Sequence, residues 1–248
     1  MKGSPEPQGR EIQVKHFSFK RKERDSRLFN RRQQVSPAVI KRLPRYHRYL
    51  GELLRNDKLR ISSSDLSALM GVTASQIRQD LNCFGGFGQQ GYGYNVRYLY
   101  DKISDLLGVN AGFGAIIIGA GNLGRALVSS HMFERRGVRK LALFDVKPEI
   151  VGTTVAGIPV LHIHELEDFM KSQKVQIAVL TTPKEAAAEV MNKAIALGIS
   201  GIWNFSNMEL KSPSPDVVVE NIHLGDSLMT LCYELSLRTL NENEGNPS

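Results

Sequence analysis

A run of six residues, Gly119-Ala120-Gly121-Asn122-Leu123-Gly124, constrains the fold of this chain more than any other feature. It follows the apolar stretch 115–118 and precedes 125–128, which we expect to be helical. In a strand, GxGxxG turn and helix of this kind, the first glycine permits the turn and the second lets the backbone approach a pyrophosphate. The third lets the helix pack on the strand. The sequence therefore predicts a Rossmann-like dinucleotide site, and a sheet that keeps these glycines for packing alone is the alternative.

A carboxylate follows the next predicted strand. Residues 141–144 are apolar and lead into Asp145, 21 residues beyond Gly124. An acid at about this distance accepts hydrogen bonds from the ribose hydroxyls and repels a 2′-phosphate. Asp145 thus favours NAD over NADP, although the cation of Lys147 offsets part of that repulsion.

The rest of the chain alternates between the two kinds of element. We expect helices over 165–172, 184–197 and 224–240, and strands over 176–180, 201–205 and 217–221. This alternation is typical of a doubly wound, mostly parallel sheet. Ligands of such sheets lie at the carboxyl ends of the strands, which adds Thr181, Thr182, Pro183, Asn204 and Phe205 as candidate lining, with a structural turn as the alternative for each.

The length of 248 residues suggests two folded units. Charge is distributed unevenly between the two ends of the chain. Residues 1–35 hold ten Lys or Arg and four Asp or Glu, residues 36–95 hold eight and four, and residues 96–248 hold 14 and 17. A basic front half suggests contact with a polyanion such as nucleic acid, because Lys and Arg release counterions from phosphates. A solvated charged surface is the alternative. Residues 1–35 also lack regular apolar spacing, so we expect a disordered arm there.

Membrane and metal functions find little support. No stretch has the roughly 18 consecutive apolar residues of a spanning helix, and the N-terminus is charged. We expect a cytoplasmic protein that does not contact membranes. The two cysteines, Cys83 and Cys232, have no neighbouring thiols, so we expect free thiols and no zinc cluster of cysteines.

Residues 37–82 have the pattern of a helix-turn-helix. Apolar residues at spacings of three and four mark a first helix between Pro37 and Arg55, and its outer face carries arginines 42, 45, 48 and 55. A second helix starts after Ser62, which an acid follows three residues later, and ends at Gly71. The outer arginines suit a nucleic acid.

The third helix, 73–82, would be the reading helix. Thr73 caps it, and we expect Gln76 to reach back to the Thr73 amide. Its core side carries Ala74, Ile77 and Leu81. The opposite side presents polar groups that can bond bases or phosphates in a major groove: Ser75, Arg78, Gln79 and Asn82. Small helical bundles share this pattern, so a structural bundle is the alternative.

A glycine-rich segment with flanking aromatics follows at 84–96. Five glycines within nine residues predict a hairpin with a tight tip, which makes the unit a winged helix. Gln89 and Gln90 lie at the predicted tip, within reach of the DNA backbone or minor groove. A phosphate-binding loop needs a helix directly after it, whereas 94–96 continues as strand in this interpretation.

No catalytic set emerges. A dehydrogenase needs an acid or base beside the transferred hydride. Tyr98 and Lys102 have the YxxxK spacing of short-chain dehydrogenases, but they precede the glycine motif, on the segment that links the two units. None of His162, His164 and His223 has a carboxylate at a recognisable spacing. His131 follows the helix of the glycine motif, and an approach to the nicotinamide is the alternative for this residue. We therefore expect a protein that is not an enzyme.

Together these motifs resemble the Rex family of redox-sensing transcriptional repressors. The likeness runs from about Ser36 to Leu235 and is carried by the following segments: KRLPRY at 41–46, ISS at 61–63, QIRQDL at 76–81, FGGFGQQGYGY at 84–94, GAGNLG at 119–124, FD at 144–145, GIPV at 157–160 and GIWNF at 201–205. The resemblance implies an α/β protein with an N-terminal winged helix-turn-helix domain, a Rossmann-like doubly wound parallel sheet and a C-terminal dimerisation helix. It further implies a homodimer that exchanges its last helix, an inverted-repeat operator in double-stranded DNA, and NADH as the releasing ligand in competition with NAD⁺. Members typically repress genes of fermentation or respiration.

On this basis we expect five segments: a basic disordered arm at 1–35, a winged-helix DNA-binding domain at 36–97, a Rossmann-like NAD(H)-binding domain at 98–222, an exchanged dimer helix at 223–240 and a tail at 241–248. The candidate cofactor residues are Gly119, Ala120, Gly121, Asn122, Leu123, Gly124, Asp145, Lys147, Thr182 and Pro183. The candidate DNA contacts are Arg42, Arg45, Tyr46, Arg48, Ser62, Ser63, Ser75, Gln76, Arg78, Gln79, Asn82, Gln89 and Gln90.

The sequence departs from the family pattern at three places. The arm of 35 residues is additional, Gly86 stands where an acid is often found in the wing, and His223 stands where an acid commonly precedes the last helix. This histidine puts in doubt any salt bridge of that acid with Arg48, and a pH-sensitive switch at this position is a hypothesis. Two other functions stay open: an NAD-dependent oxidoreductase with a fused basic domain, and a protein that binds CoA or another nucleotide.

Overall fold

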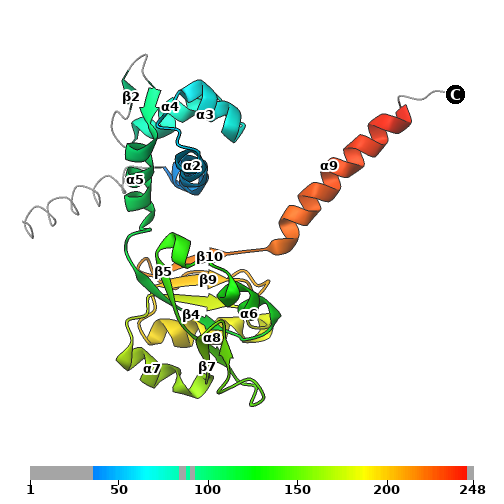
Figure 1. The fold of residues 1–248 in the computed structure, drawn as a ribbon. Coiled ribbons are helices and arrows are strands. Elements are labelled where there is room, and N and C mark those ends of the chain that lie inside the picture. Colours follow the sequence, from blue (N-terminus) through cyan, green and yellow to red (C-terminus); the bar gives the residue numbers. More distant parts are fainter. Residues whose placement is uncertain (1–35, 84–87, 90–92, 245–248) are drawn as a thin grey trace, which may run out of the picture. The chain divides into compact units, whose positions relative to one another are not determined.

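The computed structural model describes residues 36–83, 88–89 and 93–244. The predicted arm at 1–35 and the wing residue Gln90 lie outside the described residues. Contacts divide the chain after Asn110 into two units, which are described separately. Figure 1 shows the helices α2 to α5 in the first unit and the large sheet in the second.

The first unit is a helix-turn-helix with a small sheet. Its helices are α2 (Pro37–Arg55), α3 (Ser63–Met70), α4 (Ala74–Asn82) and α5 (Val96–Leu107). Three strands, β1 (Arg60–Ile61), β2 (Gly88–Gln89) and β3 (Gly93–Asn95), pair antiparallel in the order β1-β3-β2. The hairpin of β2 and β3 was predicted, whereas the third strand β1 was not. One core joins the helices through buried side chains that include Leu43, Tyr46, Leu50, Leu66, Ile77, Leu81, Leu99 and Ile103.

Side-chain caps begin the two helices of the reading motif, as predicted. The hydroxyl of Ser62 accepts a hydrogen bond from the Asp65 amide, and that of Thr73 accepts one from the Gln76 amide. Gly71 ends α3 in the left-handed conformation that favours glycine, with φ of 63°. The turn between α3 and α4 is therefore encoded locally.

Helix α5 corrects the interpretation of residues 94–96 as a continuous strand, and it includes residues 98–102, which were expected only to link the two units. The strand ends at Asn95, whose side chain accepts a hydrogen bond from the Tyr98 amide and so begins a helix instead of extending the strand. Val96, Leu99 and Ile103 of this helix are fully buried in the core of the first unit. The division of the chain consequently falls after Asn110 and not after residue 97, because α5 packs with the helix-turn-helix.

The second unit is built on a seven-stranded sheet. Its strands are β4 (Phe113–Ile118), β5 (Val138–Asp145), β6 (Thr154–Val155), β7 (Ile158–His162), β8 (Ile177–Leu180), β9 (Gly201–Asn204) and β10 (Val218–Asn221). They lie in the order β10-β9-β8-β4-β5-β7-β6, all pairs parallel except β6 with β7. The chain runs outward from β4 through β5 and β7, then returns to β8 on the other side of β4. This places the topological switch point of a doubly wound sheet between β4 and β8.

Alternate side chains of β4 serve two cores. Ile116 and Ile118 face the core that includes α7 (Leu166–Ser172) and α8 (Lys184–Ala196). Ala115 and Ile117 face the core that includes α6 (Asn122–Ser129). A strand buried on both faces needs a continuous apolar sequence, which explains the run at 115–118. The remaining elements are two short 3₁₀ turns, η1 (Glu134–Arg136) and η2 (Ile163–Glu165), and the long C-terminal helix α9 (Leu224–Glu244).

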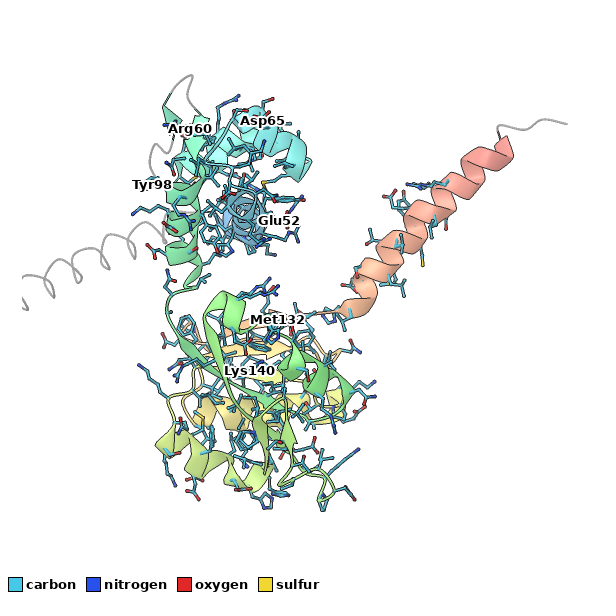
Figure 2. All side chains as sticks on the ribbon, in the orientation of Figure 1. Glu52, Arg60, Asp65, Tyr98, Met132 and Lys140 are labelled. Atoms are coloured by element: carbon cyan, nitrogen blue, oxygen red, sulfur yellow. The ribbon has the colours of Figure 1, made fainter. Side chains whose placement is uncertain are left out.

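Lys140 of β5, labelled in Figure 2, fastens the end of α6 to the sheet. Its side chain is 7% exposed and donates to the carbonyls of Val128 and Ser130 at 2.6 and 3.0 Å and to the Glu134 carboxylate at 2.7 Å. The bond with Lys140 lowers the pKa of the Glu134 carboxyl. An ammonium offers three donors, so this set of acceptors satisfies all of them.

We expect Lys140→Met to lower the free energy of unfolding by about 2 kcal/mol, because it leaves two carbonyls at the end of α6 without their charged donor. Chemical denaturation measures this change. Lys171→Met is the matched control, since Lys171 forms its ion pairs at 65% exposure, where such pairs contribute little. Equal losses in the two variants would contradict a special role of Lys140.

Candidate functional site

The three glycines of the motif have three different surroundings. The Gly119 amide donates to the Phe144 carbonyl at 2.8 Å, and its φ of +107° is a conformation that other residues rarely adopt. A side chain on Gly124 would collide with the Gly119 carbonyl, and one on Gly121 would meet nothing within 4 Å. The turn and the helix packing thus require glycine at 119 and 124, whereas the space beside Gly121 is open to a ligand.

A cavity of about 740 Å³ lies at the carboxyl ends of the strands. Helix α6 begins after Gly121 and α8 after Pro183, and neither has a side-chain cap at its first turn. Gly121, Pro183 and Lys184 all line the cavity. Because uncapped helix N-termini present amide donors and partial positive charge, this cavity suits a phosphorylated ligand.

Asp145 holds the glycine turn and lines the same cavity. One carboxylate oxygen accepts the Ala120 amide at 2.6 Å, and the other accepts the amides of Val146 and Lys147 at 2.8 and 3.0 Å. A carboxylate has about four acceptor positions, so there is room for a further donor such as a ribose hydroxyl.

The threonines that follow β8 differ in their bonding. Thr181 donates to the Gly119 carbonyl at 2.7 Å and so ties β8 to the glycine turn across the switch point. Thr182 lines the cavity, and its hydroxyl is the only buried side-chain polar atom without a partner within the part of the chain that the structure describes. An unsatisfied buried hydroxyl is costly, so its position favours a hydrogen bond with a bound molecule.

Most of the residues that the sequence nominated for a ligand meet at this cavity. Six of the ten cofactor candidates line it: Gly119, Gly121, Asp145, Lys147, Thr182 and Pro183. Ala120, Asn122, Leu123 and Gly124 form the turn and first turn of α6 behind that lining. Thr181 and Phe205 also line it, whereas the buried Asn204 bonds the Met208 carbonyl and Asn221 instead. Sequence reasoning missed further lining residues that no local motif marks: Ile163 in η2, Lys184 and Glu185 in the first turn of α8, and Ser206 and Asn207 after β9.

The outer face of α4 is polar and exposed, as predicted for a reading helix. Ser75, Arg78, Gln79 and Asn82 are all exposed. Arg78 donates to the hydroxyl of Ser63 at 3.2 Å, which links α4 to the start of α3. These side chains can bond base edges and phosphates. Gln89 is in β2, but its side chain lies outside the description, as does Gln90.

Three of the four arginines of α2, all candidate DNA contacts, already have partners within the first unit. Arg45 donates to the Met70 carbonyl at 2.6 Å, and the Arg48 guanidinium lies 5.2 Å from the ring centre of Tyr49. Arg42 makes two bonds with Asp80 and keeps 27% of its side chain exposed. These bonds fix the positions of the three guanidinium groups.

Two assignments in this region are wrong. Tyr46 cannot contact DNA, because its side chain is 0% exposed and its hydroxyl donates to Asp80 at 2.9 Å. Gln76 does not reach back to the Thr73 amide, because its own amide donates to Asp80 at 2.7 Å. In both cases the buried carboxylate of Asp80, which lies on a different helix from Tyr46 and one turn beyond Gln76 in α4, determines the side-chain position.

Asp80 is the functional candidate that sequence reasoning missed. Burial by itself would raise the pKa of this carboxyl, but hydrogen bonds from Arg42, Gln76 and Tyr46 lower it below its ordinary value. Burial and the bond with Asp80 raise the pKa of Tyr46. Asp80 is therefore ionised and Tyr46 protonated at neutral pH.

No carboxylate was expected beside His223, but its Nε2 lies 2.9 Å from the carboxylate of Glu209, 14 residues earlier in the chain. Within the described ranges, no group of three or more His, Cys, Asp or Glu side chains is placed to hold a metal ion. Cys83 and Cys232 are both free and exposed. Among the helices that the structure describes, none combines the length and the apolar character needed to cross a membrane.

Helix α9 is apolar on two opposite sides. At about 100° per residue, Leu224, Leu228, Leu231 and Leu235 form one stripe, and Met229, Tyr233 and Leu237 form a second on the far side. Their exposures in the single chain range from 40% to 65%. Since a helix that is hydrophobic around its circumference is normally buried, α9 presents two surfaces that another chain can cover.

Known proteins resemble this chain over nearly all its described length. Residues 34–82 match the family described as "Putative DNA-binding protein N-terminus", and residues 110–208 match the CoA binding domain family. The redox-sensing transcriptional repressor Rex of Thermoanaerobacter pseudethanolicus is 51% identical over 207 residues, which cover 84% of this chain and 92% of that protein. Rex of Caldicellulosiruptor saccharolyticus is 51% identical over 214 residues, covering 86% and 97%.

Solved structures agree with this likeness. The crystal structure of RSP, a Rex-family repressor, covers 86% of this chain and 99% of its own, with 47% identity and a TM-score of 0.78. RSP is also known in complex with NAD⁺ and operator DNA, at 49% identity and a TM-score of 0.78, and in complex with NADH, at 47% and 0.77. This chain belongs to the Rex family of redox-sensing transcriptional repressors.

Proposed function

We propose that the chain is a homodimeric repressor that binds an inverted-repeat operator and releases it when NADH occupies the cavity at the switch point. Genes of fermentation or respiration are the expected targets, and the cytoplasm is the expected location. The observation that carries the proposal is the pairing, in one Rex-family chain, of an exposed polar reading helix with a cavity lined by the glycine motif. RSP, which is about half identical, forms complexes with both kinds of ligand.

The nucleotide would lie across the switch point. Its pyrophosphate would meet the first turn of α6 beside Gly121, and one ribose would donate to Asp145. The other half would then extend toward Thr182 and Pro183, where the Thr182 hydroxyl lacks a partner. The ten nominated cofactor residues remain our candidates, with Ala120, Asn122, Leu123 and Gly124 acting through the backbone or by packing.

The DNA contacts would come from α4, the middle of α2, the start of α3 and the wing. The candidates retained are Arg42, Arg45, Arg48, Ser62, Ser63, Ser75, Gln76, Arg78, Gln79, Asn82, Gln89 and Gln90. The arginines and hydroxyls would bind phosphates and so fix the position of the protein along the duplex. The polar face of α4 would contact the base edges.

Helix α9 would join two copies by exchange. Each of the two apolar stripes can pack against a different surface. A helix that packs on a single sheet needs only one such stripe. A twofold dimer then presents two reading helices to two half-sites about one helical turn, or a multiple of it, apart.

Release follows from linkage. A ligand shifts an equilibrium only through its different affinities for the two states, so NADH must bind better to the conformation that does not match the half-sites. DNA then weakens NADH binding by the same factor. NAD⁺ would compete without triggering release, because burial of its positive ring at an apolar interface costs more than burial of the neutral reduced ring.

The test is operator affinity measured across NADH/NAD⁺ ratios at fixed total nucleotide. We expect affinity to fall as the NADH fraction rises. Affinity that is independent of the ratio would rule out the sensor. Turnover of an alcohol or hydroxy acid with hydride transfer would favour an oxidoreductase instead. Preferential binding of CoA, whose family description matches residues 110–208, would favour the other alternative.

Asp145 supplies a separate prediction about cofactor choice. We expect Asp145→Asn to raise the ratio of NADPH to NADH affinity on the order of tenfold, because removal of the negative charge removes the repulsion of a 2′-phosphate. Fluorescence titration with both nucleotides measures the ratio. Glu185→Gln removes another carboxylate from the cavity lining and should leave the ratio nearly unchanged; a similar change in both variants would show that Asp145 is not the discriminating residue.

A further inference from the structure

Asp80 combines two properties that are rarely found together. It lies on α4, the reading helix, between the exposed Gln79 and the buried Leu81. Among residues 36–83, 88–89 and 93–244 it is also the only charged residue with 0% exposure, whereas the side chain of Lys140 keeps 7%. Asp80 therefore belongs to the reading helix without being able to touch DNA.

Four donors converge on this carboxylate. Arg42 approaches it as a fork, with Nε 2.7 Å from Oδ2 and Nη2 2.7 Å from Oδ1. The Tyr46 hydroxyl donates to Oδ2 at 2.9 Å, and the Gln76 amide donates to Oδ1 at 2.7 Å. A carboxylate has about four acceptor positions, so the set is complete.

The arrangement fixes the rotation of α4 on α2. Two of the donors, Arg42 and Tyr46, come from successive turns of α2. The two parallel hydrogen bonds of a guanidinium with a carboxylate require the two groups to lie in nearly one plane, which restricts their relative orientation. The apolar contacts of Ile77 and Leu81 hold the two helices together but allow small rotations, because the hydrophobic effect is non-directional. Any rotation of α4 would displace Arg78, Gln79 and Asn82 relative to a base edge.

We propose that Asp80 is the positioning residue of the reading helix. Its carboxylate sets the rotation of α4 and also orients Arg42 and Gln76, two candidate DNA contacts. A gain in stability does not by itself explain the cluster, because buried ion pairs contribute little more than apolar residues of the same size. The inference rests on the proposed DNA binding. Asp80 would determine how well the chain distinguishes one DNA sequence from another, and not how tightly it binds DNA in general.

The experiment compares Asp80→Asn with the wild-type chain on two probes, the operator duplex crystallised with RSP and a base-shuffled duplex of the same length. Measurements are made well below the unfolding temperature of each variant. Because each well-placed base contact contributes about 1 to 3 kcal/mol of discrimination, we expect the ratio of operator to shuffled affinity to fall about 10- to 100-fold. Affinity for the shuffled duplex, which depends on phosphates, should change by no more than about twofold, and NADH affinity should not change.

Glu52→Gln is the matched control, since it removes one carboxylate from an exposed position of α2 (Figure 2). It should leave the ratio at its wild-type value, and an equal fall in this variant would attribute the effect to charge and overturn the proposal. An unchanged ratio in a folded Asp80→Asn chain would also overturn it. If that variant does not fold, Tyr46→Phe removes a single donor from the carboxylate, and a ratio that does not fall there overturns the proposal as well. A wild-type chain that does not prefer the operator refutes the proposed function itself.

Discussion

Gly121→Asp should abolish the release of operator DNA by NADH while leaving operator binding intact. An aspartate at this position precedes α6 and can accept hydrogen bonds from the first amides of the helix, as Asp commonly does at N-caps. These are the donors that a pyrophosphate would use. The new carboxylate would therefore fill the anion site with its own charge and repel the ligand, and we expect NADH affinity to fall about 100-fold or more, since both the donors and the favourable potential are lost.

The fold should tolerate this change. Gly121 has φ of −70°, within the range of ordinary residues, and an added Cβ meets no atom within 4 Å. Calorimetry would measure NADH affinity, and a titration of the operator complex with NADH would measure release. Release at wild-type NADH concentrations would contradict the placement of the pyrophosphate at α6.

Gly124→Ala provides the contrast within the same motif. Its Cβ would collide with the Gly119 carbonyl and lie 2.9 Å from the Thr181 hydroxyl oxygen, so the variant should lose stability as well as NADH binding. Thermal unfolding distinguishes the two substitutions. If both destabilise the chain equally, the space beside Gly121 is not open in solution.

The second unit could be predicted in detail because its signals are local. The strand β4, the glycine turn and α6 occupy consecutive residues. Gly119 and Gly124 have the steric roles that their positions in the motif specify, and Gly121 leaves space for a ligand. The order of strands and helices then leaves few topologies, because parallel crossovers are right-handed. The cavity lining from Ile163 and Asn207 could not be predicted, since these loops meet only after the sheet has formed.

The first unit shows where such reasoning fails. Helix α5 was missed because Tyr98 and Tyr100 suit strands and follow a glycine-rich hairpin, although Asn95 is a helix cap and the spacing of Val96, Leu99 and Ile103 is helical. Asp80 was missed for a different reason. Its partner Arg42 lies 38 residues away, so no periodicity within α4 could reveal that a carboxylate would be buried there.

Charged substitutions in helix α9 should separate the proposed homodimer into single chains and so lower the affinity for the operator. Leu228→Glu together with Leu235→Glu places two charges in one apolar stripe, where burial of an unpaired carboxylate is strongly unfavourable. A monomer can engage only one half-site at a time. Because linked binding can exceed single-site binding by about 10² to 10⁴, we expect operator affinity to fall within that range, while binding to an isolated half-site stays nearly unchanged.

Ser227→Glu is the matched control, because it adds a carboxylate to the first turn of α9 outside both stripes, where an acid suits the helix N-terminus. It should remain dimeric in analytical ultracentrifugation and bind the full operator. Cavity and helix make different contributions in this scheme: Gly121→Asp leaves a dimer that cannot be released, and the α9 variant leaves a chain that can still bind NADH but cannot hold both half-sites. A double leucine variant that is dimeric and binds the operator as the wild-type chain does would show that the exposed stripes of α9 are not the dimer interface.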